Sequence, residues 1–231
     1  MSAPAEKPRR DLTMAAIPAL FAAALAGLSV LFLVGQGQEQ PPTSAIPNCI
    51  LGENAAAVGG AIRLSDQNGV RVTQADFAGE PVVVYFGFTR CPDACPITMN
   101  LLNEALTTPG GSDVRTVLIT LDPERDTPAL LRDYVTTAGF PPGLTALTGS
   151  RAEIEAAKAA FQVFSARSGG DMASSTIDHS SLIYVLNPQW RTVAIMPTVV
   201  RSDEQNPVSP LISAPAEDVA ACIRAGLGGP A

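Results

Sequence analysis

The sequence is poor in residues that many functional sites need, and each shortage narrows the class of protein. It has one histidine, His179, and four cysteines in 231 residues. Structural zinc requires four protein ligands, and no second closely spaced pair accompanies Cys91 and Cys95, so zinc is disfavoured. Basic residues number 15 against 22 acidic ones, for a formal charge of −7. No basic stripe exists to neutralise phosphates, which argues against a nucleic-acid-binding surface.

Charge is absent from a long stretch near the start of the chain. Residues 12–38 contain no charged side chain and are rich in Leu, Ala, Val and Phe, and three basic residues precede them. This pattern predicts a membrane-spanning helix with its amino end in the cytoplasm and the rest of the chain on the far side. A cleavable signal peptide is the alternative, but its apolar region usually runs only about 7 to 15 residues. The expected organisation is a cytoplasmic N-terminus (1–11), a transmembrane helix (12–35), a stalk (36–58) and one globular domain (59–231).

Apolar patterning in the rest of the chain predicts an α/β domain. The dipeptide Asn68-Gly69 between two alternating segments predicts a β-hairpin near the start of the domain. The continuous apolar run 82–86 predicts a strand buried on both faces, and Ser150 with Glu153 predicts a capped helix start. The expected strands are 61–64, 70–72, 82–86, 114–121, 181–186 and 191–196, and the expected helices are 96–106, 128–138, 151–161 and 215–225. Alternating strands and helices, with a hairpin at each end, predict an α/β sandwich with a mixed central sheet.

Two cysteines four residues apart follow the buried strand. Pro92 cannot lie inside a helix and Pro96 suits the first helical position, so we expect Cys91 on a loop and Cys95 at the helix start. A helix amino terminus stabilises negative charge, and this predicts a lowered pKa for Cys95. Two thiolates and one imidazole favour Cu(I), provided that the fold brings His179 to them. From the spacing alone, a permanent disulfide between Cys91 and Cys95 remains an alternative.

Three motifs occur in the order found in a known family. They are Gly87-Phe88-Thr89-Arg90-Cys91-Pro92-Asp93-Ala94-Cys95-Pro96, Leu121-Asp122-Pro123-Glu124-Arg125-Asp126-Thr127-Pro128 and Asp178-His179-Ser180-Ser181. With the single amino-terminal helix, they resemble the Sco (SenC) family of membrane-anchored, thioredoxin-fold copper proteins. The likeness covers about residues 59–227. It implies that Cys91, Cys95 and His179 jointly bind one copper ion per chain, as Cu(I) or Cu(II).

The resemblance also implies a function and a location. The chain would be a copper-binding protein, not an enzyme, that delivers copper to the CuA site of cytochrome c oxidase during assembly, or reduces the thiols of that site. Implied partners are the CuA-bearing oxidase subunit and a thioredoxin-like protein that keeps the thiols reduced. The implied location is the inner membrane with the domain in the periplasm, or in the intermembrane space of a eukaryotic mitochondrion. An extracytoplasmic thiol-disulfide oxidoreductase or a peroxiredoxin-like peroxidase is the alternative.

The acidic residues within the three motifs are expected to act on the ligands or on the local fold, and not to bind the metal themselves. Asp93 and Asp178 are expected to tune the thiolates or to orient the imidazole, because ligands of metal sites need such partners. The charged residues of the segment 122–126 are interpreted as loop-ordering and helix-capping groups. A direct part in the chemistry is not expected of them.

Three other residues stand apart from the family pattern. Trp190 occupies a turn position where the family commonly has glycine. Cys49 and Cys222 lie outside the metal motifs. By its spacing on the last helix, Cys222 is expected to be a small core residue, and a disulfide with Cys49 across the domain is the other possibility considered.

Overall fold

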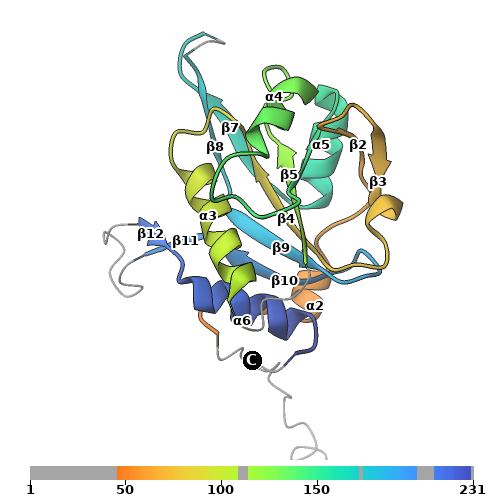
Figure 1. The fold of residues 1–231 in the computed structure, drawn as a ribbon, viewed down its shortest axis with the longest axis vertical. Helices are drawn as coiled ribbons and strands as arrows, with labels where there is room; N and C mark the ends of the chain where they lie inside the picture. Colours follow the sequence, from red (N-terminus) through yellow and green to blue (C-terminus); the bar gives the residue numbers. More distant parts are fainter. Residues whose placement is uncertain (1–45, 109–113, 172–173, 202–210, 230–231) are drawn as a thin grey trace, which may run out of the picture. The chain divides into compact units, whose positions relative to one another are not determined.

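The structure is a computed structural model, and it describes residues 46–108, 114–171, 174–201 and 211–229. Within these residues, eight strands form one sheet in the order β1-β10-β9-β4-β5-β6-β2-β3 (Figure 1). The strands are β1 (Ile50–Leu51), β2 (Arg63–Asp66), β3 (Arg71–Thr73), β4 (Val82–Gly87), β5 (Arg115–Thr120), β6 (Thr145–Thr148), β9 (Leu182–Leu186) and β10 (Thr192–Pro197). Strands β4, β5 and β6 run parallel, and the other pairs are antiparallel. The predicted mixed central sheet is confirmed.

Strand β4 lies in the middle of this sheet, between β9 and β5. All six of its residues are buried, as the continuous apolar run predicts for a strand covered on both faces. Strand β5 is buried over five of its six residues. The parallel pair therefore gives the site a rigid base, because the ends of both strands are fixed by the hydrophobic core.

The predicted hairpin is β2 and β3, joined by the Asn68-Gly69 turn. Asp66 Oδ1 accepts the N–H groups of Asn68 and Val70 at 2.9 and 2.8 Å, and Gly69 has φ +80°. The turn chemistry thus matches the sequence signal, since a left-handed φ favours glycine. The hairpin joins the edge of the main sheet through β6.

Five helices of four residues or more cover the described part of the sheet. They are α2 (Glu53–Ala56), α3 (Ala94–Thr107), α4 (Pro128–Tyr134), α5 (Arg151–Ala160) and α6 (Ala216–Gly226), and a short 3-10 turn spans Gln74–Phe77. Helices α3 and α6 pack against each other and lie across one face of the sheet in Figure 1. Helix α5 packs on β2, and α4 packs on β6. The capping box predicted for α5 is present, with the Ser150 N–H donating to Glu153 Oε2 at 2.8 Å.

Two predicted helix boundaries are wrong. Helix α3 begins at Ala94 and places Pro96 in its first turn, where the backbone donors are unpaired and proline is tolerated. Helix α4 ends at Tyr134 and not near residue 138. Thr136 and Thr137 follow it, and their hydroxyls donate to the carbonyls of Asp133 and Tyr134 at 2.7 Å each. Such local bonds from threonine compete with continuation of the helix.

The domain begins earlier than the predicted boundary at residue 59. Cys49 and Cys222 form a disulfide, with a Cα–Cα distance of 5.8 Å, and β1 pairs with β10. The segment from Ile46 onward therefore packs on the domain, and the disulfide considered as a possibility between Cys49 and Cys222 is confirmed. Among the described residues, no helix is long and apolar enough to cross a bilayer. The predicted membrane helix, 12–35, lies outside them.

Two short ribbons lie outside the main sheet. One is formed by β7 (Ser165–Ser168) and β8 (Thr176–His179), and the other by β11 (Val199–Arg201) and β12 (Leu211–Ser213). The first ribbon ends at the single histidine. Neither ribbon is predicted by the sequence, because both are short and carry no clear alternation.

Trp190 has a left-handed backbone conformation, with φ +59°, a value that favours glycine and is unfavourable for a bulky residue. Two contacts offset this strain. The indole ring stacks on Phe77 with centroids 5.4 Å apart, and its Nε1–H donates to the carbonyl of Gly60 at 2.8 Å. The tryptophan therefore packs its ring on the domain while its N–H closes the turn on the Asn187 carbonyl at 2.9 Å.

Candidate metal centre

The two motif cysteines lie where β4 passes into α3. Cys91 is on the connecting loop, and Cys95 is in the first turn of α3, as predicted. Asp93 caps this helix, and its Oδ1 accepts the Ala94 N–H at 2.6 Å. The loop after the parallel strand β5 reaches the same edge of the sheet, since carboxyl ends of parallel strands lie together. Open α/β sheets commonly place their functional sites at this edge.

The structure brings Cys91, Cys95 and His179 together. Their ligand atoms all lie within 4.8 Å of one another, and Cys95 Sγ is 3.9 Å from His179 Nε2. Two sulfurs on one zinc-sized ion are at most about 4.6 Å apart, twice a metal–sulfur bond of roughly 2.3 Å. The three donors therefore fit one metal ion after small side-chain shifts. Cys91 and Cys95 are not bonded to each other, and the predicted disulfide alternative is not the form seen here.

His179 is the last residue of β8 and presents Nε2 to the sulfurs. Its Nδ1 lies 2.9 Å from the carbonyl oxygen of Ser180. A carbonyl can only accept, so Nδ1 carries the proton and Nε2 keeps a free lone pair for a metal. The rings of Tyr85 and Phe88 contact the imidazole edge-on, each with centroids 6.0 Å away. Asp178 is exposed, and the expectation that it orients the imidazole is wrong because the Ser180 carbonyl does so.

The two cysteines differ in charge state, and in the direction opposite to the sequence prediction. A hydrogen bond from the Cys95 thiol lowers the pKa of Cys91 to about 4. The Cys95 N–H also donates to Cys91 Sγ at 3.2 Å, so the helix amino terminus points at Cys91. The hydrogen bond to Cys91, with burial, raises the pKa of Cys95. Cys91 is therefore the thiolate of the metal-free pair, and the lowered pKa predicted for Cys95 is wrong.

A chain of hydrogen-bonded hydroxyl groups leads from the Cys95 sulfur into the domain. The Tyr85 hydroxyl lies 3.8 Å from Cys95 Sγ and 3.4 Å from Ser181 Oγ. Ser181 Oγ continues to Thr198 Oγ1 at 2.7 Å, and the Thr98 hydroxyl donates to Thr198 Oγ1 at 3.0 Å. Burial raises the pKa of Tyr85 well above its usual value, so the phenol stays protonated and can donate to the sulfur. This chain of hydroxyls could not be predicted from the sequence, because its members come from β4, α3 and the segments that flank β9 and β10.

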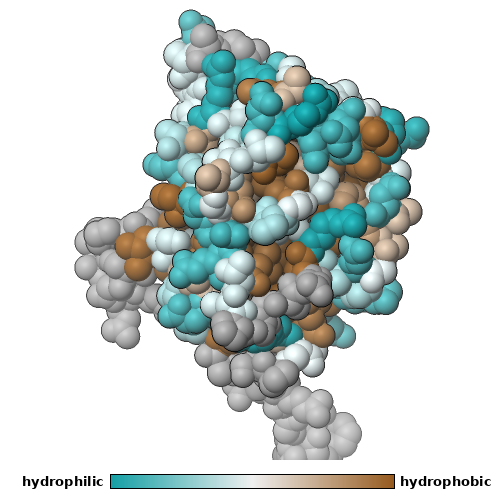
Figure 2. All heavy atoms as spheres, in the orientation of Figure 1, coloured by the Kyte–Doolittle hydropathy of each residue, from teal (hydrophilic) through white to brown (hydrophobic). Residues whose placement is uncertain are grey.

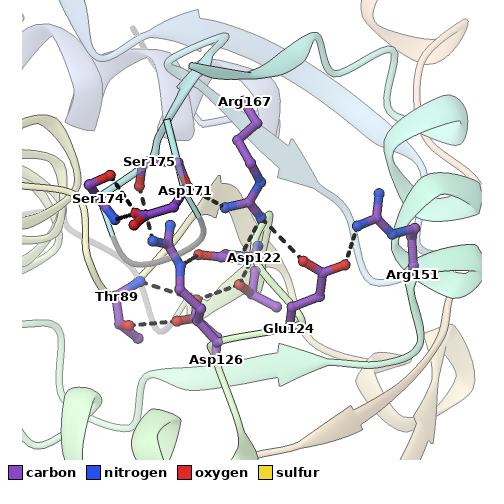
Figure 3. A network of polar contacts seen from close by, with 11 residues as sticks. Thr89, Asp122, Glu124, Asp126, Arg151, Arg167, Asp171, Ser174 and Ser175 are labelled. Carbon is purple, nitrogen blue, oxygen red and sulfur yellow. Dashed lines mark hydrogen bonds and ion pairs between the residues drawn. The ribbon is translucent and has the colours of Figure 1, made fainter. Parts of the chain in front are cut away.

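The second motif forms a polar network beside the cysteines (Figure 3). Asp126 accepts the Thr89 N–H at 3.1 Å and the hydroxyls of Thr89 and Thr120 at 2.5 Å each. Asp122 is fully buried and forms ion pairs with Arg125 and Arg167. The predicted loop-ordering role of this motif is confirmed.

The predicted helix-capping role of the charged residues in 122–126 is wrong. Thr127 caps α4, and its hydroxyl accepts the Leu130 N–H at 3.3 Å. The buried carboxylates of Asp122 and Asp126 instead contact arginines and hydroxyls inside the fold, and Glu124 pairs with the exposed Arg151. Arg167, their partner from β7, was missed because it lies 45 residues after Asp122 and belongs to no motif.

The surface of the described domain is mixed. Figure 2 shows hydrophobic groups set between hydrophilic ones on the face it presents. The large exposed apolar side chains among the described residues are Ile50, Val70, Ile97, Leu130, Phe164 and Ile212. Two of them belong to segments that adjoin the ligands in the chain or through a backbone hydrogen bond. Ile97 follows Cys95 on α3, and Phe164 precedes β7, where its carbonyl accepts the Ser180 N–H at 3.0 Å.

A mixed sheet with a Cys-x-x-x-Cys loop between its central strand and the next helix defines a thioredoxin-like protein with a thiolate–imidazole site. Comparison with known proteins gives the family. The family model described as SCO1/SenC matches residues 52–207, and the chain belongs to that family.

Relatives in bacteria support the assignment. The chain is 37% identical over 139 residues to a SCO2-like protein of Rickettsia felis, a match that covers 58% of this chain and 67% of that protein. It is also 37% identical over 141 residues to protein SenC of Rhodobacter capsulatus, with 60% and 62% covered. The solved structure of Bradyrhizobium japonicum ScoI with copper bound is similar, with a TM-score of 0.58 and 31% identity. That likeness covers 74% of this chain and all of the other.

Proposed function

We propose that this protein binds one copper ion through Cys91, Cys95 and His179 and delivers it to the CuA site of cytochrome c oxidase during assembly. The convergence of the three ligand atoms within 4.8 Å carries the proposal. Two sulfurs and an imidazole are the donors that copper prefers among common metals. A copper-bound structure of similar fold and 31% identity adds support.

The burial of the ligands suits a protein that passes its metal on. Cys95 is fully buried, whereas Cys91 and His179 are partly exposed. An ion held by this set can be approached from solvent on the side of Cys91 and His179. Phe164, with an exposed fraction of 66% and a backbone hydrogen bond to Ser180 beside His179, gives a docking oxidase subunit an apolar group to bury near the ion.

We also propose that the domain is held at a membrane by residues 12–35, with residues 1–11 in the cytoplasm and the domain on the far side. The support is the uncharged, apolar stretch and the basic residues before it. The location is then the periplasmic face of an inner membrane, or the intermembrane space of a mitochondrion. A thioredoxin-like reductant would be needed there to keep the cysteines reduced.

Thiol exchange is a second candidate function, and the cysteine pair favours it. Cys91 is poised as a thiolate beside the Cys95 thiol, an arrangement that can attack a disulfide and then resolve the mixed intermediate. Reduction of a disulfide between the cysteines of the CuA site to two thiols would use the same pair without copper, and would leave Cys91 and Cys95 joined in a disulfide. The protein would then act as an accessory reductant and not as a metabolic enzyme.

A copper titration separates these functions. The full chain in detergent, with Cys91 and Cys95 reduced, should bind one copper per chain and show thiolate-to-Cu(II) charge transfer in its optical spectrum. The variant His179→Ala should weaken binding and change the spectrum. A fragment from residue 59 is unsuitable because it lacks Cys49 and β1. Absence of stoichiometric binding in the wild type would reject copper delivery and leave thiol exchange as the function.

A further inference from the structure

One loop contacts both segments that carry the proposed ligands. This loop joins β5 to α4, and its two buried carboxylates point in different directions (Figure 3). Asp126 binds the backbone and hydroxyl of Thr89, two residues before Cys91. Asp122 binds Arg167 on β7, the strand that pairs with the strand of His179. The loop therefore lies between the cysteine segment and the histidine segment.

The contacts on the histidine side converge on Ser175, the residue before β8. Arg167 donates from Nη2 to Asp122 Oδ1 at 2.8 Å and from Nη1 to Ser175 Oγ at 3.0 Å. Arg125 pairs with the other oxygen of Asp122 and donates from Nη1 to the Ser175 carbonyl at 3.0 Å. Both guanidinium groups thus connect one buried carboxylate to the start of the strand that ends at His179.

This connection adds to the apolar contacts of the ribbon, in which Ile177 is buried in the core and the rings of Tyr85 and Phe88 contact His179. Within the described residues, β7 and β8 pair only with each other and are not part of the main sheet. A two-stranded ribbon is marginally stable by itself. Its carboxyl end continues into β9, which is part of the main sheet. Ser175, directly before β8, is bound by Arg125 and Arg167. His179 therefore lies between two fixed points, the strand β9 in the main sheet and the arginines paired with Asp122.

We propose that Asp122 and Arg167 are positioning residues for the metal centre. The buried carboxylate, held between two arginines, sets the place of β8 and thereby the distance from His179 Nε2 to the two sulfurs. This inference rests on the proposed function, because the distance matters only if the three groups share an ion. Neither residue contacts the ion itself.

The first test uses two arginines of the same network. In Arg167→Met the link to Asp122 and Ser175 is lost, and Cu(I) affinity of the full chain should fall roughly 10-fold, the lower end of the 10- to 100-fold range for supporting partners of metal ligands. The lower end is expected because the Arg167 side chain is 32% exposed. Arg151→Met is the matched control, since Arg151 lies on α5 and pairs with Glu124, whereas Arg167 binds Asp122 and Ser175. Equal losses in the two variants would overturn the proposal.

A second test asks whether Arg167 acts through His179. In a His179→Ala background, adding Arg167→Met should cause no further loss of Cu(I) affinity, because the group being positioned is gone. A further 10-fold loss there would show that Arg167 only stabilises the fold, and would overturn the proposal.

A third test needs no metal. Hydrogen exchange of the reduced, copper-free chain should be faster at residues 176–180 in Arg167→Met than in Arg151→Met or the wild type. Exchange in α5 and β5 should be unchanged. If the wild type binds no copper, the proposed function fails. Faster exchange at residues 176–180 in Arg167→Met would even then show that Arg167 stabilises β8. Unchanged exchange at 176–180 would overturn the positioning role whatever the copper result.

Discussion

The two halves of the metal centre are held in place by different forces. The cysteine half follows β4, a strand with every residue buried in the middle of the sheet. The histidine half ends a ribbon outside that sheet, and polar contacts with Asp122 hold the start of its second strand. Apolar packing therefore places Cys95, whereas the imidazole is placed by polar contacts at the start of β8 together with the rings of Tyr85 and Phe88.

This difference bears on the proposed delivery of copper. Core packing is dense and changes little without unfolding, so Cys95 in the core keeps its position. Cys91 and His179 are partly exposed, so an acceptor protein can reach these two ligands first. Stepwise transfer should therefore end with the buried Cys95.

Loss of the disulfide should have the largest effect on the free energy of unfolding. It should destabilise the cysteine half and the histidine half equally, because both belong to the same domain. Replacing Cys49 and Cys222 with serine should lower the free energy of unfolding by about 2–5 kcal/mol, because the bridge closes a very long loop. Guanidinium unfolding measures this, and copper stoichiometry should remain one. The matched control is Cys91→Ser with Cys95→Ser, which should lose copper but much less stability. Lost copper binding in the bridge variant would show that the bridge also shapes the centre.

Within the cysteine half, the two thiols should differ greatly in reactivity. Because its pKa is lowered to about 4, Cys91 is a thiolate throughout neutral pH, whereas Cys95 is protonated and buried. Iodoacetamide should alkylate Cys91 before Cys95, with a rate on the order of 100-fold higher at pH 6. The alkylation rate of Cys91 should stay constant from about pH 5.5 to 8, because this range lies above its pKa. The rate of an ordinary cysteine rises about tenfold for each pH unit below its pKa. Mass spectrometry of the reduced chain gives both rates, and a faster Cys95 would reverse the assignment.

Gly87→Ala should disturb the cysteine half alone. A Cβ at Gly87 would lie 2.9 Å from Cys95 Sγ and 2.9 Å from a ring carbon of Tyr85. Overpacking of this kind costs about 1–3 kcal/mol, and the displaced sulfur should shift the charge-transfer band of bound Cu(II). Gly170→Ala is the control near the histidine half, because its Cβ would meet only Ser174 Oγ, at 4.0 Å. An unchanged spectrum in Gly87→Ala would mean that the sulfur position tolerates crowding from the core.

The smallest effect concerns a capping box remote from both halves. The Arg71 guanidinium lowers the pKa of Glu153 to about 2 from an ordinary 4.5. A lowered folded-state pKa gives stability that is present above pH 4.5 and lost as pH falls toward 2. Glu153→Gln should therefore cost at most about 1 kcal/mol at pH 7, because the ion pair is partly exposed, and progressively less as the pH falls from 4.5 through 2. Unfolding curves across this pH range test it, and copper binding should not change.

Much of the fold could be predicted because local signals agreed with the tertiary result. The apolar run of β4, the Asn68-Gly69 turn and the Ser150 cap each reflect a property of neighbouring residues. Strands β7 and β8 could not be predicted, since their residues neither alternate nor form an apolar run. Their order depends on contacts with a loop about 45 residues earlier in the chain.

The sequence alone determined which chemistry is present: two thiols four residues apart after a buried strand, and one histidine for the whole chain. It also determined the family, through three motifs in order. Only the tertiary structure decided that His179 reaches Cys95, that Cys91 and not Cys95 is the thiolate, and that Arg167 supports the ribbon. The physical reason is that burial, hydrogen bonding and ion pairing depend on which distant segments meet, and spacing along one chain does not specify that.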